Sequence, residues 1–318
     1  MLEFNPSDYQ NFLYGVLPKN ILARSKLHVF TLWDENLILF WNKGDVRCFK
    51  NSCPHYGLPL DQGKLTNGQI QCGFHGWQFN LSNGKLHSAP YAKKNPNCNL
   101  EEYKTFIKGG IIFVFPGEDS KFEEAKRFVL HDICENQASA WTIYEVPFYL
   151  AMNSSTDYPH HAFHSYFYIL YGFYRALFFK KNPLLTTYSP VMLDETHSSF
   201  KFKIPENSVE ITVYPFCTQY NDLVSSNKWQ IFVSPISKTK SRYLININSF
   251  SRNPLYRFFT YMLFHTVIRH IAMPEDQKWL KSSFENFKTG TNINICDHDF
   301  GLKTYLRKFF IHASKKKA

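Results

Sequence analysis

The sequence predicts an α+β protein, in which a small all-β domain is followed by a larger domain of antiparallel strands and helices. Three observations lead to this class. Between residues 27 and 115, short apolar runs alternate with turn-forming residues, as is typical of short strands. Two Asn-Gly pairs, at 67–68 and 83–84, lie between apolar segments and are strong hairpin signals. After residue 118, strand-like segments occur together with segments of helical periodicity.

The expected elements follow from these patterns. In the first domain we expect strands at residues 28–33, 37–41, 46–49 and 111–115. In the second domain we expect strands at 199–204, 209–216, 229–236 and 242–250, and helices within 157–174, 255–271 and 301–311. The domains should span residues 20–118 and 119–318, with residues 1–19 packed on the second. A curved sheet wrapped by helices would leave a cavity for a small molecule.

The composition is that of a folded protein with a basic C-terminal tail. The chain has 318 residues, of which 44% are hydrophobic and 19% charged, so it can bury a core. The formal net charge is +10, and residues 301–318 contribute six basic residues and no acid to it. Because the excess is mostly a tail, nucleic-acid binding is not expected. The tail is interpreted as a solvated helix end, and peripheral contact with an anionic membrane or an acidic redox partner stays open.

Membrane-spanning and secretory signals are not expected, so the protein is predicted to be cytoplasmic. The two most apolar stretches, 166–179 and 255–273, are interrupted by basic residues: Arg175, Arg257, His265, Arg269 and His270. The N-terminus carries acids where a secretory signal would carry basic residues and an apolar run. The seven cysteines are an odd number spread thinly over the chain, which does not favour a disulfide framework.

The first candidate metal site combines Cys53 and His55 with Cys72 and His75. Cys-x-His is followed by Cys-x-x-His, so each of two loops offers one thiolate and one imidazole. In a Rieske [2Fe–2S] cluster, two Cys bind one iron and two His bind the other, which is the set that these loops supply. Zinc fingers normally group Cys with Cys and His with His, so zinc is the weaker interpretation.

The second candidate metal site is centred on Asp157, His160 and His164. Residues three and four apart share a face of a helix, and Pro159 is tolerated in a first helical turn, so these residues are expected at a helix start. Two His one turn apart, joined by a carboxylate from elsewhere, form the 2-His-1-carboxylate site of Fe(II) oxygenases. A zinc metalloprotease needs Glu directly after the first His. His161 stands there instead, which excludes that class.

The loops at residues 53–60 (Cys-Pro-His-Tyr-Gly-Leu-Pro-Leu) and 72–79 (Cys-Gly-Phe-His-Gly-Trp-Gln-Phe) resemble those of a known family. They are similar to the cluster-binding loops of the Rieske non-haem iron oxygenases, in the α subunit of the terminal oxygenase component. The resemblance extends from about residue 37 to the C-terminal helix. Tyr56 stands where many members have Arg, and Gly73 where many have Pro. Neither residue is a ligand, so the cluster assignment is unaffected.

The resemblance also implies the remaining iron ligand. The family's mononuclear site has Asn, Asp and two His in the order found from Asn153 to His164, and a carboxylate far downstream. Residues 273–279 resemble that downstream segment, with Asp276 as the expected ligand and Glu275 as the alternative. The group at 297–299 (Asp-His-Asp) is interpreted as a cap for the C-terminal helix.

The implied fold is a Rieske β domain joined to a helix-grip catalytic domain. The implied enzyme uses dioxygen, and electrons from a separate reductase or ferredoxin, to hydroxylate, dealkylate or desaturate a small hydrophobic or ring-bearing substrate at a mononuclear iron. NAD(P)H would act only through the reductase. The alternative is a Rieske electron carrier without a catalytic iron. The iron ligands are the same for all these reactions, so the sequence does not separate them.

The resemblance assigns Asp157 a role other than iron binding. Its carboxylate would contact a cluster-binding His of a neighbouring subunit, here His75, so that electrons cross between chains. Such a relay needs a closed, head-to-tail homotrimer.

Overall fold

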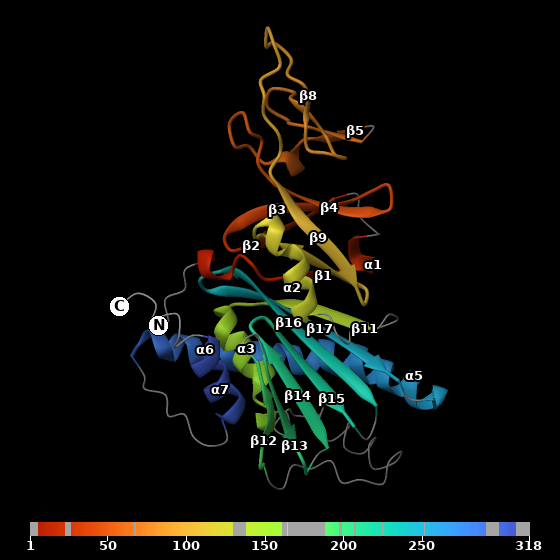
Figure 1. Ribbon diagram of the computed structural model, residues 1–318, viewed down its shortest axis with the longest axis vertical. Coiled ribbons are helices and arrows are strands. Elements are labelled where there is room, and N and C mark those ends of the chain that lie inside the picture. The colour runs from red at the N-terminus through yellow and green to blue at the C-terminus, as the bar shows by residue number, and fades with distance from the viewer. Residues whose placement is uncertain are drawn as a thin grey trace. The chain divides into compact units, whose positions relative to one another are not determined.

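The computed structural model describes residues 6–22, 27–66, 68–129, 138–160, 164, 188–196, 199–206, 208–223, 226–250, 252–290 and 299–309 (Figure 1). The chain divides into two units. The first, which we call the β unit, contains residues 4–133 and 236–238. The second, the mixed unit, contains residues 134–235 and 239–318 together with residues 1–3. The predicted α+β class is confirmed.

The main sheet of the β unit is six-stranded, with the order β1-β10-β9-β4-β3-β2. The four strands expected in this domain are confirmed within two residues at each end. The elements are η1 (Pro6–Tyr9), β1 (Tyr14–Pro18), α1 (Lys19–Leu22), β2 (His28–Leu32), β3 (Glu35–Asn42), β4 (Asp45–Lys50), β9 (Glu102–Lys108) and β10 (Ile111–Phe115).

Both ends of the β unit lie outside the bounds expected from the sequence. Strand β1 pairs with β10, and Trp33 Nε1 donates a hydrogen bond to the Tyr14 hydroxyl (3.0 Å). The described residues 6–19, which were expected to pack on the second domain, belong to the β unit. At the other end, η3 (Asp119–Lys121) and α2 (Phe122–Val129) also belong to the β unit. The Phe122 ring lies against Phe115, with the ring centroids 5.5 Å apart.

A second sheet of the β unit carries the two cysteine-containing loops. Its order is β5-β6-β7-β8, from β5 (Lys64–Thr66), β6 (Gln69–Gln71), β7 (Gln78–Asn80) and β8 (Leu86–Ser88), and η2 (Leu60–Gln62) precedes it. Hairpins lie at both Asn-Gly pairs, although Asn67 itself is outside the described residues. Gly84 has φ +69°, and a Cβ there would lie 2.9 Å from the Phe49 ring, so the turn accommodates only glycine.

The mixed unit is built on a seven-stranded antiparallel sheet with the order β11-β17-β16-β15-β14-β13-β12. The four strands expected in this domain are confirmed within two residues. The strands are β11 (Ala138–Tyr144), β12 (Val191–Glu195), β13 (Phe200–Ile204), β14 (Val209–Tyr214), β15 (Cys217–Asp222), β16 (Asn227–Ser237) and β17 (Lys240–Ser249).

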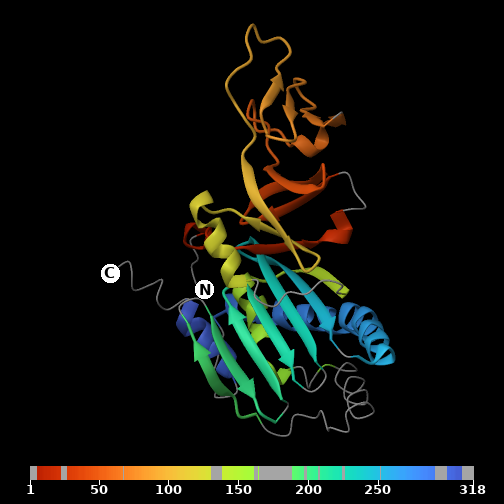
Figure 2. The same ribbon diagram turned by 45° about the vertical axis from the view of Figure 1, so that its right-hand side comes forward.

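Helices cover one face of this sheet (Figures 1 and 2). They are α3 (Phe148–Thr156), α5 (Pro254–Leu263), the π-helical segment η5 (Phe264–Ala272), α6 (Met273–Lys288) and α7 (Phe300–Phe309). The helices expected within 255–271 and 301–311 are confirmed. No helix in the described ranges combines the length and apolar character needed to cross a bilayer.

The helix expected from residue 157 onward is not formed at residues 157 and 158, whereas residues 159 and 160 lie in a 3-10 turn. Helix α3 ends at Thr156, and Asp157 has the non-helical angles φ −90° and ψ 90°. The cause is local, because Pro159 disfavours the α conformation at Tyr158 and lacks an N–H of its own. Residues 161–163 and 165–187, which include His161 and most of that expected helix, lie outside the described residues.

Candidate metal centres

The two loops of the β unit have the same backbone hydrogen-bonding pattern. In the first, Gly57 N–H donates to Cys53 O (2.7 Å), and in the second, Gly76 N–H donates to Cys72 O (3.1 Å). The two glycines have φ +72° and +70°, a conformation that side chains disfavour. The loops are therefore a matched pair of turns, each beginning at a cysteine.

A close backbone approach holds the two loops against each other. A Cβ at Gly63 would lie 1.9 Å from Gln71 O, so only glycine allows the segment after the first loop to pass the start of the second. The buried Asn51 side chain fixes the far side of the first loop, since its Oδ1 accepts hydrogen bonds from the N–H groups of Leu60 (2.8 Å) and Asp61 (3.0 Å).

The predicted cluster ligands come together with the sulfurs inside and the imidazoles outside. Cys53 and Cys72 are buried, and their thiols are hydrogen-bonded to each other. Burial raises the pKa of the Cys53 thiol to about 11, although hydrogen bonds from the backbone N–H groups of His55 and Tyr56 act in the opposite direction. The rings of His55 and His75 have centroids 4.8 Å apart, and His55 is exposed. This donor set fits a [2Fe–2S] cluster whose His-bound iron faces outward.

Aromatic side chains surround the two imidazoles. Trp77 stacks on His55, with a centroid distance of 4.3 Å and an interplanar angle of 5°. Tyr56 and Phe74 are 69% and 61% exposed, and both rings contact His75. The stack orients His55, and the two exposed rings border the outward side of the site.

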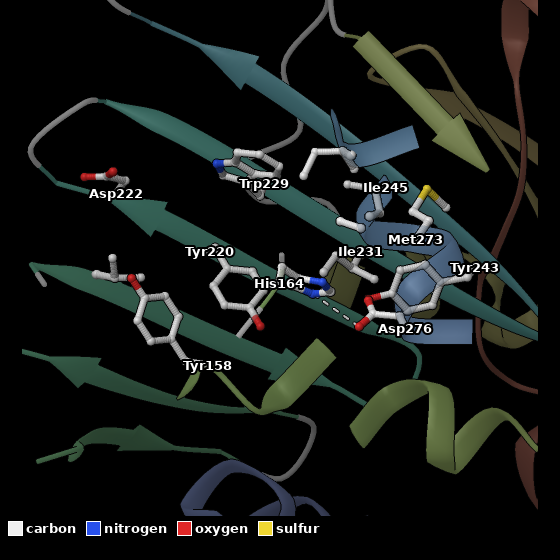
Figure 3. Close-up of a pocket in the computed structure, with 13 residues that line it drawn as sticks. Tyr158, His164, Tyr220, Asp222, Trp229, Ile231, Tyr243, Ile245, Met273 and Asp276 are labelled. Carbon is white, nitrogen blue, oxygen red and sulfur yellow. Dashed lines mark ion pairs between the residues drawn. The ribbon is translucent and has the colours of Figure 1, made fainter. Parts of the chain in front are cut away.

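In the mixed unit, the structure brings together His160, His164 and Asp276. One ligand atom from each lies within 4.8 Å of the others. Asp276 Oδ1 is 3.5 Å from His160 Nε2 and 3.3 Å from His164 Nε2 (Figure 3 shows the second pair). Two ligand atoms each about 2.1 Å from a metal ion are roughly 3.0 Å apart at a right angle. The three side chains therefore fit one first-row metal ion.

The other ring nitrogen of each His has its own acceptor. His164 Nδ1 is 3.0 Å from Glu275 Oε2, and His160 Nδ1 is hydrogen-bonded to the main-chain carbonyl of Asp157. Acceptors of this kind fix the tautomer and orientation of metal-binding His. The Asp157 carboxylate is 3.8 Å from His160 Nδ1, beyond hydrogen-bond distance, so it does not act as this acceptor. Glu275 therefore faces the outer side of His164, while Asp276 faces both Nε2 atoms.

The electrostatics favour an anionic carboxylate at Asp276. Burial alone would raise the pKa of Asp276, but the hydrogen bonds and charges of His160 and His164 lower it well below its usual range. For His164, burial lowers the pKa, and the hydrogen bonds and charges of Asp276 and Glu275 outweigh burial, so the net shift is upward. Tyr144 lies near Asp276, and its own pKa is raised strongly, first by burial and then by that negative charge. The two histidines thus favour the anionic form of Asp276.

One continuous helical run carries the downstream carboxylates. Asn253 caps its start, accepting hydrogen bonds from the N–H groups of Leu255 (3.0 Å) and Tyr256 (3.2 Å). At the end of η5, the N–H of Met273 bonds to Ile268 O, five residues back, and Pro274 has no N–H to donate. The wide π turns therefore lead directly into the turn that presents Glu275 and Asp276 to the histidines.

Asp157 lies beside the metal ligands, at the end of α3. Burial raises the pKa of its carboxyl, the charge of His160 lowers it, and Asp299 raises it further. Asp299 directly precedes α7, whose Gly301 approaches α3 so closely that a Cβ would lie 2.3 Å from Thr156 O. This contact fixes the end of α3. Asp297 and His298 of the expected cap are outside the described residues.

A cavity of about 100 Å³ is lined by two of the three metal-ligand candidates, His164 and Asp276 (Figure 3). Three aromatic residues of the strands line it: Tyr220, Trp229 and Tyr243. Among the lining residues, Asp222 is a buried carboxylate. The full lining is Tyr158, His164, Val209, Tyr220, Asp222, Trp229, Ile231, Tyr243, Ile245, Ile268, Ala272, Met273 and Asp276. The cavity is therefore mainly apolar, with two of the metal-ligand candidates in its wall.

Sequence comparison agrees with the geometry of the β unit. Residues 13–116 match the family described as Rieske [2Fe-2S] domain. Chlorophyllide a oxygenase of Chlamydomonas reinhardtii is 33% identical over 112 residues, which cover 34% of this chain and 17% of that protein. The chain therefore spans about a fifth of the length of the curated relatives it matches first.

Solved structures with the same fold cover nearly the whole chain. A crystal structure of dicamba monooxygenase bound to dicamba has a TM-score of 0.74 at 14% identity, covering 97% of this chain and 98% of that chain. A carbazole-bound oxygenase in a ferredoxin complex of carbazole 1,9a-dioxygenase has a TM-score of 0.72 at 16% identity, covering 94% and 88%. Residues 13–116 thus match the Rieske [2Fe–2S] domain, and the chain has the fold of these two solved oxygenase structures.

Proposed function

We propose that this protein is a Rieske non-haem iron oxygenase that oxidises a small hydrophobic or ring-bearing substrate. The observation that carries the proposal is the convergence of His160, His164 and Asp276 beside an apolar cavity, in a chain that also has a Rieske domain. When bound, a mononuclear iron would supply dioxygen activation, and the cluster would supply single electrons. The sequence relatives and structural neighbours are oxygenases, which supports this class.

The residues of the chain have distinct roles in this proposal. Asp276 supplies the anionic ligand, and the two His supply neutral nitrogen ligands. Glu275 and the carbonyl of Asp157 hold the outer nitrogens of those rings. Trp279 stacks on His164 with an interplanar angle of 25°, which further restricts the ring. Cys53, His55, Cys72 and His75 hold the cluster.

The cavity supports the substrate class. Its walls are branched aliphatic and aromatic side chains, including Val209, Ile231 and Trp229, which exclude water and favour apolar groups.

We further propose that electrons arrive from a separate reductase or ferredoxin. A ferredoxin complex among the structures of this fold supports that partner.

An iron count combined with a substrate screen tests the proposal against a plain electron carrier. The oxygenase should bind about three iron atoms per chain, and the carrier about two, because only the oxygenase has the mononuclear site. Candidate substrates incubated with a surrogate reductase and dioxygen should show mass changes that correspond to hydroxylation, dealkylation or desaturation. Two irons per fully loaded chain would reject the oxygenase.

We also propose that Asp157 relays electrons between subunits of a homotrimer. The position of its partly buried carboxylate beside His160 supports this role. Asp157→Asn should keep both metal centres, since neither loses a ligand, and should lower turnover by at least about tenfold because the bridging hydrogen bonds weaken. Single-turnover reduction of the mononuclear site measures this step directly. Full activity in a metal-replete Asp157→Asn protein, or an active monomer, would reject the relay.

A further inference from the structure

Helix α5 of the mixed unit exposes a continuous apolar stripe. Leu255, Phe258, Phe259 and Met262 are 55%, 56%, 42% and 47% exposed. They are spaced i, i+3, i+4 and i+7, so they share one face of the helix. We call these four residues the α5 stripe. Large apolar side chains grouped in this way on a surface mark an interaction site.

The opposite face of the same helix is packed into the mixed unit. Tyr256 and Thr260 are buried, and the Tyr256 hydroxyl accepts a hydrogen bond from Asn227 Nδ2 (2.8 Å) on β16. The helix is thus anchored by one face, so the exposure of the α5 stripe is not the result of an undocked helix. The inner face of α5 packs on the core of the mixed unit, so the α5 stripe on the outer face indicates a binding partner outside that core.

The surroundings of the α5 stripe are basic. Residues 252–272 contain three arginines, two histidines and no acid. Arg252, Arg257 and Arg269 are exposed, and none of them forms an ion pair within the described part of the chain. An apolar face on a helical run rich in exposed Arg is the pattern of helices that lie in the interface of a bilayer.

We propose that α5 binds the surface of an anionic membrane. The α5 stripe enters the boundary between head groups and acyl chains, and the arginines contact lipid phosphates. A membrane fits better than an acidic electron donor, because four large apolar groups form the centre of the surface. The proposal does not depend on the proposed function.

Vesicle sedimentation of the holoprotein tests this inference. Wild-type protein should sediment with vesicles of phosphatidylcholine and phosphatidylserine, and less with phosphatidylcholine alone. Phe258→Asp combined with Met262→Asp should lower the partition coefficient at least about tenfold, because two apolar anchors are lost. Arg257→Glu combined with Arg269→Glu should remove the preference for phosphatidylserine and its sensitivity to salt.

A matched control uses exposed apolar residues elsewhere in the mixed unit. Val191 and Leu193 on β12 are 50% and 46% exposed, and replacing both with Asp should leave vesicle binding unchanged. Iron content and circular dichroism establish that each variant is folded. As a second readout, the fluorescence of Phe258→Trp should shift to the blue with anionic vesicles. Wild-type protein that stays in the supernatant overturns the proposal. The proposal is also overturned if the α5 variants bind vesicles normally but accept electrons slowly, since the α5 stripe would then bind a protein that donates electrons.

Discussion

Asp276→Ala is expected to remove one of about three iron atoms per chain and to abolish substrate oxidation, while leaving the cluster intact. Its Oδ1 is the atom that faces both His160 Nε2 and His164 Nε2, at 3.5 and 3.3 Å. Without the carboxylate, two neutral imidazoles in a buried site must hold a divalent cation with no anionic ligand, so iron is lost. Metal analysis gives the iron count, and the spectrum of the reduced protein reports the cluster separately.

Two carboxylates on the same helix serve as controls for this variant. Glu275→Ala removes only the acceptor for His164 Nδ1, so iron affinity should fall by about 10- to 100-fold without complete loss. Glu285 is exposed and pairs with Lys288, so Glu285→Ala should change neither iron content nor activity. If Glu275→Ala lost the iron and Asp276→Ala kept it, the assignment of the ligand would be reversed.

His55→Cys, which replaces one of the two His ligands, is expected to lower the reduction potential of the cluster by roughly 100 mV or more, part of the way to an all-Cys cluster. Two His on one iron place a Rieske cluster at about −150 to +300 mV, whereas all-Cys clusters of the plant ferredoxin type lie near −400 mV. A thiolate adds negative charge to the cluster and so stabilises its oxidised form. Turnover should fall with the potential, because reduction by the electron donor becomes unfavourable.

Potentiometric titration monitored by electron paramagnetic resonance measures this shift. Wild-type protein should give a rhombic signal with an average g below 2 on reduction, and His55→Cys should shift or abolish it. His87→Cys is the matched control, since His87 lies on an exposed position of β8 in the same unit. Unchanged spectra in both His55→Cys and His75→Cys would remove the cluster assignment.

The cluster loops could be predicted from the sequence because all of their determinants are local. The cysteines and histidines lie two or three residues apart, and the turns between them depend on nearby glycines such as Gly57 and Gly76. Four strands of each large sheet were predictable for a similar reason, since apolar alternation and turn residues act over a few positions. Strand β1 was missed because Gly15 and Pro18, which are typical of turns, leave it only a short apolar run.

The mononuclear site was only partly predictable. Spacing identified the two histidines. The choice between Glu275 and Asp276 depends on which of the two side chains faces His164 Nε2 in the folded protein, and these residues are more than 100 positions away from His164 in the sequence. The helical geometry assumed for Asp157 was wrong, because Pro159 ends α3 before it. The consequence is that the carbonyl of Asp157, and not its carboxylate, holds His160. No side-chain pattern can show a main-chain acceptor of this kind.

The π-helical segment Phe264–Ala272 makes the helical run tolerant of changes in length. A deletion within a regular α-helix turns everything beyond it by about 100°. Such a deletion between Ala272 and Asp276 would swing the carboxylate away from both histidines. Within the π segment, the loss of a residue can instead be absorbed as a wide turn tightens to an ordinary one. Related proteins can therefore differ in length within this segment, while the carboxylate still faces the histidines and the α5 stripe keeps its orientation.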